Sequence, residues 1–206
     1  MRSWIGLTLL LLATTAAPAH AQSPETAPMP AALRGDYVFI DSAEVGRGFH
    51  IYVRYPEGYD PASARLYPTV YVTDGDSLFP MLAPVQLFLH YDDGLPEVLM
   101  VGIAYGGFDP AVNRRHIDFQ TPGLRVDQAG ADAFQRFLKT ELIPRIEARY
   151  RADPQRRILF GQSRGGAFVL YSAVTDPDLF WGRIASNPSL TPGLESLMAP
   201  AAPASR

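Results

Sequence analysis

The residues best suited to chemistry lie in the last quarter of the chain, at positions 161–165, which read GQSRG. They fit the pattern G-x-S-x-G, in which a sharp turn presents a serine hydroxyl as a nucleophile. An apolar run at 157–160 leads into the pattern, and another at 167–170 follows it. This strand–turn–helix context predicts a nucleophile elbow with Ser163 attacking a carbonyl carbon. The alternative interpretation is a glycine-rich turn with an inert serine.

Backbone N–H groups are candidates for stabilising the oxyanion that forms when Ser163 attacks. The N–H of Arg164 lies at the start of the predicted helix, where N–H groups are free and carry partial positive charge. A second donor is expected after an earlier strand. Gly75 and Asp76 follow the apolar run 69–73 and are assigned to that role. Because Asp-Gly is also common in plain turns, a simple turn is the alternative here.

Short strands must bring these residues to one edge of a sheet. The runs 69–73, 98–104 and 158–160 are apolar and uninterrupted, which is typical of parallel strands buried on both faces. Residues 183–186 predict one more strand. The segments between the strands are long enough for helical crossovers, so the pattern favours an α/β open sheet.

The N-terminal part of the sheet is predicted to be antiparallel. Residues 49–55 alternate between two faces with the period of a strand. Residues 37–40 are its expected antiparallel neighbour, with the connecting turn near Gly46 and Gly48.

Two helices are expected in the second half of the chain. Apolar residues from Phe134 to Tyr150 follow helical spacing, and Pro144 should kink or restart that helix. The second helix covers 165–174, directly after the candidate nucleophile. His90, by contrast, is placed in a loop.

The composition indicates one globular domain. The chain has 206 residues, of which 47% are apolar and 19% charged, enough to bury a sizeable core. Its net charge of -3 is scattered, with no basic stripe for nucleic acid and no polybasic run for a membrane surface. The absence of cysteine excludes disulfides, thiolate catalysis and cysteine zinc sites. We expect no metal or cofactor, and a small-molecule ester as the binding partner.

The N-terminus predicts export to a secreted or periplasmic location. Arg2 is followed by an apolar core at 4–12, and residues 19–21 (AHA) form a small-x-small cleavage site. Residues 1–21 are therefore interpreted as a signal peptide that leaves no membrane anchor.

Three further segments complete the predicted organisation. Residues 22–34, rich in Pro and Ala, are expected to form a flexible leader. Residues 35–192 form an incomplete α/β-hydrolase domain in this interpretation, and residues 193–206 an irregular tail.

Four segments resemble the esterase family of α/β-hydrolases that includes the D-type esterases, enterobactin esterases, feruloyl esterases and mycolyltransferases. The matching segments are an opening strand with its P-x-G-Y turn, an oxyanion strand, an R-x-x-D-x-T-P loop and a nucleophile helix, at 47–59, 71–76, 115–122 and 161–180 respectively. The resemblance extends over about residues 36–190. No single one of these motifs is specific to the family. Their occurrence together, in the family's order along the chain, is specific.

The resemblance implies an α/β-hydrolase fold, a mostly parallel sheet with helices on both faces. It implies a serine carboxylic-ester hydrolase that works through an acyl-enzyme on Ser163. Siderophore lactones and aryl or acyl esters are the substrates it suggests. It also places Arg115, His116 and Asp118 in a loop on the substrate side.

One feature departs from the family pattern. In this fold the acid and the histidine follow the serine, whereas all four histidines precede Ser163: His20, His50, His90 and His116. We therefore expect a C-terminally truncated domain without its last strands, acid and base. Loss of a triad member costs roughly 10⁴ to 10⁶ in rate, so weak or no turnover is expected. His116 could approach the site as a substitute base, although a solvated loop histidine is the commoner case.

The missing strands would also leave the strand at 183–186 as an exposed edge. Such an edge offers unpaired backbone groups to another chain. Self-association through this edge is therefore expected, and a soluble, cooperatively melting monomer would count against it.

Two other functions stay open at this point. A non-catalytic binding protein of α/β-hydrolase type fits the absent histidine, but it has no need of an intact elbow. An acyltransferase would use the same serine. Phe108, Phe119 and Trp181 either line an acyl or aryl pocket or pack in the core, and the core is the commoner place for such side chains.

Overall fold

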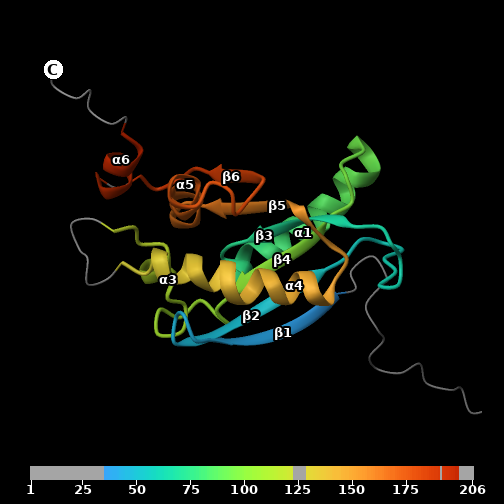
Figure 1. The fold of residues 1–206 in the computed structure, drawn as a ribbon, viewed down its shortest axis with the longest axis horizontal. Coiled ribbons are helices and arrows are strands. Elements are labelled where there is room, and N and C mark those ends of the chain that lie inside the picture. Colours follow the sequence, from blue (N-terminus) through green and yellow to red (C-terminus); the bar gives the residue numbers. More distant parts are fainter. Residues whose placement is uncertain (1–34, 123–128, 191, 200–206) are drawn as a thin grey trace, which may run out of the picture.

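The fold of the chain is shown in Figure 1, a computed structural model that describes residues 35–122, 129–190 and 192–199. The predicted signal peptide and leader, and the last residues of the predicted tail, lie outside these ranges. Among the helices described, none has both the length and the apolar character needed to cross a membrane.

A six-stranded sheet forms the centre of the molecule, in the order β1-β2-β4-β3-β5-β6. Its strands are β1 (Gly35–Ser42), β2 (Arg47–Arg54), β3 (Tyr67–Val72), β4 (Leu99–Ala104), β5 (Ala152–Gln162) and β6 (Gly182–Ser186). The β1–β2 and β2–β4 pairs are antiparallel, and the pairs joining β4, β3, β5 and β6 are parallel. The predicted antiparallel start and parallel remainder are both confirmed.

The turn between β1 and β2 differs in detail from the prediction. Gly46 lies in it with φ of 73°, a left-handed conformation that glycine adopts without strain. Gly48 lies inside β2 instead, paired with Asp41. A side chain at 48 would collide with the Phe39 ring, 2.1 Å from the position of a Cβ. The glycine at 48 thus makes room for the exposed Phe39 ring and is not part of the turn.

Helices cover both faces of the sheet (Figure 1). On one face lies α1 (Gly75–Asp93), over a small core formed by Val72, Ala83 and Met100. The other face carries the larger core. It is covered by three consecutive helical segments and by the helix after the elbow: α3 (Ala131–Arg136), the π-helical η3 (Phe137–Leu142), α4 (Ile143–Arg149) and α5 (Arg164–Thr175). The predicted helix-covered sheet is confirmed.

The helical run from Ala131 to Arg149 continues through Pro144 and does not end and restart there as predicted, since Leu142 and Ile143 both have helical backbone angles. What changes next to the proline is the hydrogen-bonding pattern, from π-helical in η3 to α-helical in α4. The turn before the proline widens into η3, whose Phe137, Leu138 and Leu142 are fully buried. The proline is therefore accommodated without ending the apolar face.

Helices also occur where the sequence predicted irregular structure. His90 lies in the last turn of α1, not in a loop. His116 and its neighbours form the short helix α2 (Arg115–Asp118). Where an irregular tail was predicted from residue 193, the structure has the helix α6 (Pro192–Met198). Its Leu194 is fully buried in the main core, which holds the helix against the domain.

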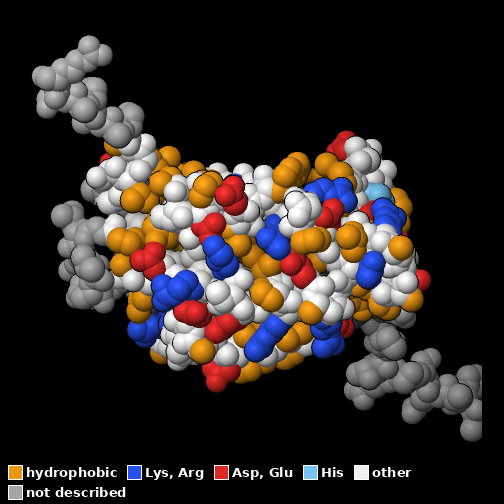
Figure 2. Space-filling model, viewed as in Figure 1, with side chains coloured by type: hydrophobic (Ala, Val, Ile, Leu, Met, Phe, Trp, Pro, Cys, Tyr) orange, Lys and Arg blue, Asp and Glu red, His pale blue; other side chains and the backbone are white. Residues whose placement is uncertain are grey.

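Charged side chains of both signs are interspersed on the face that carries α3 and α4 (Figure 2). Arg136 pairs with Glu44 and Lys139 with Asp176, each at 2.7 Å. Both cations are more than half exposed, and such surface pairs contribute little to stability. The core, rather than this surface, holds the elements in place.

Candidate active site

The turn that joins β5 to α5 holds Ser163 in a strained conformation. Its φ of 58° and ψ of -116° lie in a region that non-glycine residues rarely adopt, at a cost of about 1–3 kcal/mol. A Cβ at 161 would lie 2.3 Å from the carbonyl oxygen of Gly165. A Cβ at 165 would lie 2.4 Å from Thr73 Oγ1. Both glycines of the motif are therefore needed for strand and helix to approach this closely.

The end of β3 lies directly beside this turn. β3 and β5 are parallel neighbours, and the Thr73 N–H donates to the Phe160 carbonyl oxygen at 3.0 Å. The next residue, Asp74, is left-handed with φ of 54° and starts α1. The predicted oxyanion strand and the elbow thus end side by side at the carboxyl edge of the sheet, where ligands bind in α/β folds.

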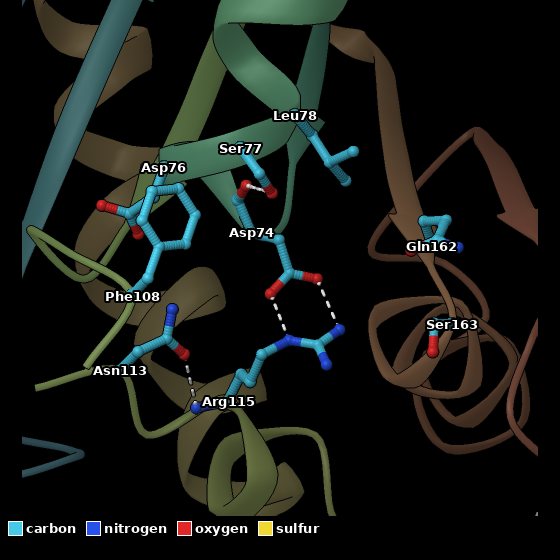
Figure 3. Close-up of a pocket in the computed structure, with 9 residues that line it drawn as sticks. All are labelled: Asp74, Asp76, Ser77, Leu78, Phe108, Asn113, Arg115, Gln162 and Ser163. Atoms are coloured by element: carbon cyan, nitrogen blue, oxygen red, sulfur yellow. Dashed lines mark hydrogen bonds and ion pairs between the residues drawn. The ribbon is translucent and has the colours of Figure 1, made fainter. Parts of the chain in front are cut away.

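A cavity of about 250 Å³ opens between these two strand ends (Figure 3). Its lining comes from the start of α1, the loop after β4, the start of α2 and the elbow: Asp74, Asp76, Ser77, Leu78, Phe108, Asn113, Arg115, Gln162 and Ser163. Figure 3 shows the side chains of Asp74 and Arg115 facing each other, with Ser163 to one side.

The ion pair between Arg115 and Asp74 is the strongest electrostatic feature of the cavity. Arg115 Nε and Nη2 donate to the two carboxylate oxygens at 2.6 and 2.9 Å, a bidentate geometry. The hydrogen bonds to Asp74 raise the pKa of Arg115, so the guanidinium stays charged. The pair fixes a cation next to the candidate nucleophile.

The two predicted oxyanion segments each place free N–H groups at a helix start. Arg164 is the first residue of α5, and Gly75 is the first of α1. First-turn N–H groups have no partner inside their own helix. Gly75 is packed against β4, where a Cβ would lie 2.8 Å from the Ile103 backbone. This close packing fixes the start of α1 against the sheet.

The side chain of Asp76 is occupied by a structural role. Its carboxylate accepts hydrogen bonds from the backbone N–H groups of Tyr105 and Gly106, at 2.7 and 2.9 Å. These bonds tie the loop after β4 to α1. The carboxylate is therefore engaged, and the oxyanion role predicted for this residue concerns its backbone N–H.

The three predicted substrate-side residues have separate positions. Arg115 lines the cavity, whereas His116 is exposed and does not. Asp118 is 1% exposed and accepts hydrogen bonds from Arg47 and, at 3.0 Å, from the Tyr105 hydroxyl. Burial raises the pKa of Asp118, and these hydrogen bonds act in the opposite direction. Asp118 thus holds Arg47 and Tyr105 together and does not line the cavity.

The three aromatic residues that were candidates for the pocket wall lie in three different parts of the structure. Phe108 is 71% exposed and lines the cavity. Phe119 is buried in the main core. Trp181 lies instead in an apolar groove of about 450 Å³ on the side of α1, together with Ile184 of β6.

The Ser163 hydroxyl has a second serine as its neighbour. Its Oγ lies 3.2 Å from Ser189 Oγ. No histidine of the described ranges lines the cavity. Sequence reasoning missed Ser189, which has no recognisable local motif. It placed Asp74 in the oxyanion segment but did not predict its ion pair with Arg115, and it did not identify Asn113.

Comparison with known proteins shows that the sequence of this chain is similar to those of esterases. Residues 42–198 match the family described as "Putative esterase". Ferri-bacillibactin esterase BesA of Bacillus subtilis is 31% identical over 166 residues, which are 73% of this chain and 57% of that protein. Apo-salmochelin esterase of Escherichia coli is 29% identical over 171 residues, 77% of this chain and 52% of that protein.

A solved structure gives the same result. The IroE-like serine hydrolase from Shewanella oneidensis superposes with a TM-score of 0.68 at 27% identity, covering 80% of this chain and 54% of that one. This likeness confirms the predicted α/β-hydrolase fold. The chain spans little more than half the length of the relatives it matches.

Proposed function

Because the chain belongs to the esterase family matched by residues 42–198, we propose that it is a carboxylic-ester hydrolase with Ser163 as its nucleophile. One observation carries the proposal. The Ser163 hydroxyl stands on a strained, glycine-flanked turn at the start of α5 and lines a cavity of about 250 Å³. Strained residues of this kind cluster at active sites, which favours a catalytic use of the serine.

The proposed reaction has two stages. Ser163 Oγ attacks the ester carbonyl carbon, and the oxyanion accepts hydrogen bonds from the Arg164 N–H and from an N–H of Gly75 or Asp76. The C–O bond to the alcohol then breaks, the alcohol leaves with the serine proton, and the acyl group stays on Ser163. Water attacks this acyl-enzyme, releases the acid and restores the hydroxyl. Both stages need a base. The described lining of the cavity contains no histidine, and its two carboxylates are already engaged, Asp74 by Arg115 and Asp76 by the backbone of the loop after β4.

The substrate class we propose is an ester of the siderophore or aryl–acyl type. Two of the relatives are named as esterases of ferri-bacillibactin and of apo-salmochelin, and a third, from Aspergillus fumigatus, is named as a siderophore triacetylfusarinine C esterase. The cavity wall contributes the Arg115 cation and the exposed Phe108 ring. Together they suit a ligand with aromatic rings and oxygen acceptors. We place this activity outside the cytoplasm because residues 1–21 have a signal-peptide pattern.

A fluorophosphonate probe tests the nucleophile independently of turnover. Attack by Ser163 Oγ on phosphorus releases fluoride and leaves a covalent adduct that intact mass spectrometry counts. Because the adduct accumulates, a slow reaction without a base is still detectable. We expect one adduct per chain, located on Ser163 by peptide mapping, and no adduct in Ser163→Ala.

Ser77→Ala is the matched control, because this serine lines the same cavity but donates its hydroxyl to the Asp74 carbonyl oxygen. Its labelling rate should equal that of the unmodified chain. A folded chain that gives no adduct would overturn the nucleophile and favour the alternative of a non-catalytic binding protein. That alternative draws on the absence of a histidine from the described cavity lining.

We also propose that copies of the chain associate through β6. Among the described strands β6 pairs with β5 alone, and Ile184 at its centre is 52% exposed. A lysine on an edge strand disfavours pairing with a second edge. Sedimentation velocity should therefore show Ile184→Lys shifted toward monomer. The control Val174→Lys, at a similarly exposed site on α5, should leave association unchanged. A monomeric unmodified chain at all concentrations would contradict this proposal.

A further inference from the structure

The strained elbow is bonded to a short segment made of the last residue of β6 and the three residues after it, residues 186–189, called here the clamp turn. The backbone N–H of Ser163 donates to the Ser186 carbonyl oxygen at 3.0 Å. The backbone N–H of Ser189 donates to the Ser163 carbonyl oxygen at 2.9 Å. Both backbone groups of Ser163 are thus bonded to the clamp turn. This double attachment explains how the elbow keeps a backbone conformation that a free chain would avoid.

The course of the clamp turn brings a hydroxyl back to the candidate nucleophile. Asn187 is left-handed with φ of 43°, a conformation that asparagine tolerates better than most residues. The chain bends at Asn187, directly after β6. Beyond the bend, Ser189 Oγ lies 3.2 Å from Ser163 Oγ, a long hydrogen bond between two hydroxyls.

The first turn of α5 is shaped to accept the clamp turn. A Cβ at position 166 would lie 3.0 Å from the Ser186 carbonyl oxygen and 3.1 Å from Pro188 Cα. Gly166 lies outside the G-x-S-x-G pattern, so the elbow motif itself does not explain it. Contact with the clamp turn does explain it, because a side chain there would push the turn away from Ser163.

We propose that Ser189 is a positioning residue for the nucleophile. A serine hydroxyl has three staggered rotamers, and a hydrogen bond to a fixed neighbour selects one of them. Ser189 is fixed by its own backbone bond to Ser163, so its hydroxyl holds Ser163 Oγ in the orientation seen beside the cavity. The inference rests on the proposed role of Ser163 and adds to it the residue that orients the attacking oxygen.

The test measures the second-order rate constant of fluorophosphonate labelling in Ser189 variants. Ser189→Ala keeps the backbone bond and removes the hydroxyl, so labelling should slow about threefold to tenfold, the effect of one neutral hydrogen bond. Ser189→Thr retains a hydroxyl and should label near the original rate. Ser189→Val has nearly the same volume as threonine without the hydroxyl and should be as slow as alanine. Thermal melts of each variant report folding separately.

Each outcome supports or overturns the inference. Slow labelling of the alanine and valine variants with normal labelling of the threonine variant supports it. Equal rates in all four chains, or equal slowing of threonine and valine, would overturn it while leaving Ser163 as the nucleophile. An unlabelled parent chain would overturn the proposed function itself, and the inference with it.

Discussion

Replacing Gly161 with alanine should dismantle the nucleophile elbow. The new Cβ would lie 2.3 Å from the Gly165 carbonyl oxygen and 2.4 Å from its carbonyl carbon. These are backbone atoms of the first turn of α5, so relief requires moving the helix away from β5. We expect the free energy of unfolding to fall by about 3 kcal/mol, the upper range for overpacking. Fluorophosphonate labelling of Ser163 should fall at least about 100-fold, because small misplacements of reacting groups have effects of that size.

Urea denaturation and the labelling rate measure the two effects on the same protein. Gly107→Ala is the matched control. No atom lies within 4 Å of a Cβ at 107, and the residue does not have positive φ. Its stability should stay within about 0.5 kcal/mol of the parent chain. A Gly161→Ala chain with parental stability and parental labelling would show that the tight approach of β5 and α5 is not what holds Ser163.

The elbow was predictable because its signals are local. An apolar strand, a G-x-S-x-G turn and an apolar helix follow one another within about twenty residues, and their order alone indicates the strand–turn–helix structure. The register that brings Ser163 beside Asp74 also followed from parallel pairing, since both residues come just after neighbouring strands. Periodicity and turn chemistry alone were therefore sufficient for the nucleophile turn and for the edge of the sheet that holds it.

The start of α1 was not predictable in the same way. Asp74 and Gly75 together resemble an ordinary turn, and Pro80 and Pro84 argue against a helix. Both prolines are nevertheless inside α1 and exposed, so water can satisfy the carbonyl groups they leave unpaired. Tertiary packing of α1 on β3 and β4 outweighs the local preference.

Polar contacts between residues far apart in the chain were even harder to predict from the sequence. Arg115 and Asp118 share one short helix, and a loop motif suggested one shared role for them. The structure directs Arg115 to Asp74 and the cavity, but Asp118 to Arg47 in β2, 71 positions earlier in the chain. Ser189 meets Ser163 from 26 positions later in the chain, beyond the bend at Asn187. Such contacts depend on the assembled fold, which no local pattern encodes.

Replacing Asp118 with alanine should therefore destabilise the fold more than it changes ligand binding. The carboxylate is 1% exposed and pairs with Arg47, whose side chain is 27% exposed. Removing it leaves a largely buried guanidinium and the Tyr105 hydroxyl without their acceptor. Breaking a buried ion pair costs about 3–5 kcal/mol, and the partial exposure of Arg47 places the expected loss near the lower end, about 3 kcal/mol. Chemical denaturation measures this loss.

Lys139→Ala is the matched control for Asp118→Ala, because it removes one partner of a surface pair with Asp176. It should cost at most about 1 kcal/mol. Asp118→Asn, which keeps an acceptor for Tyr105 but loses the charge, should lie between the two. If Asp118→Ala instead kept full stability and weakened the binding of an aryl ester, Asp118 would be a substrate-side residue, as its loop motif first suggested. The burial of the carboxylate and of its partner Tyr105, neither of which lines the cavity, is the reason to expect loss of stability instead.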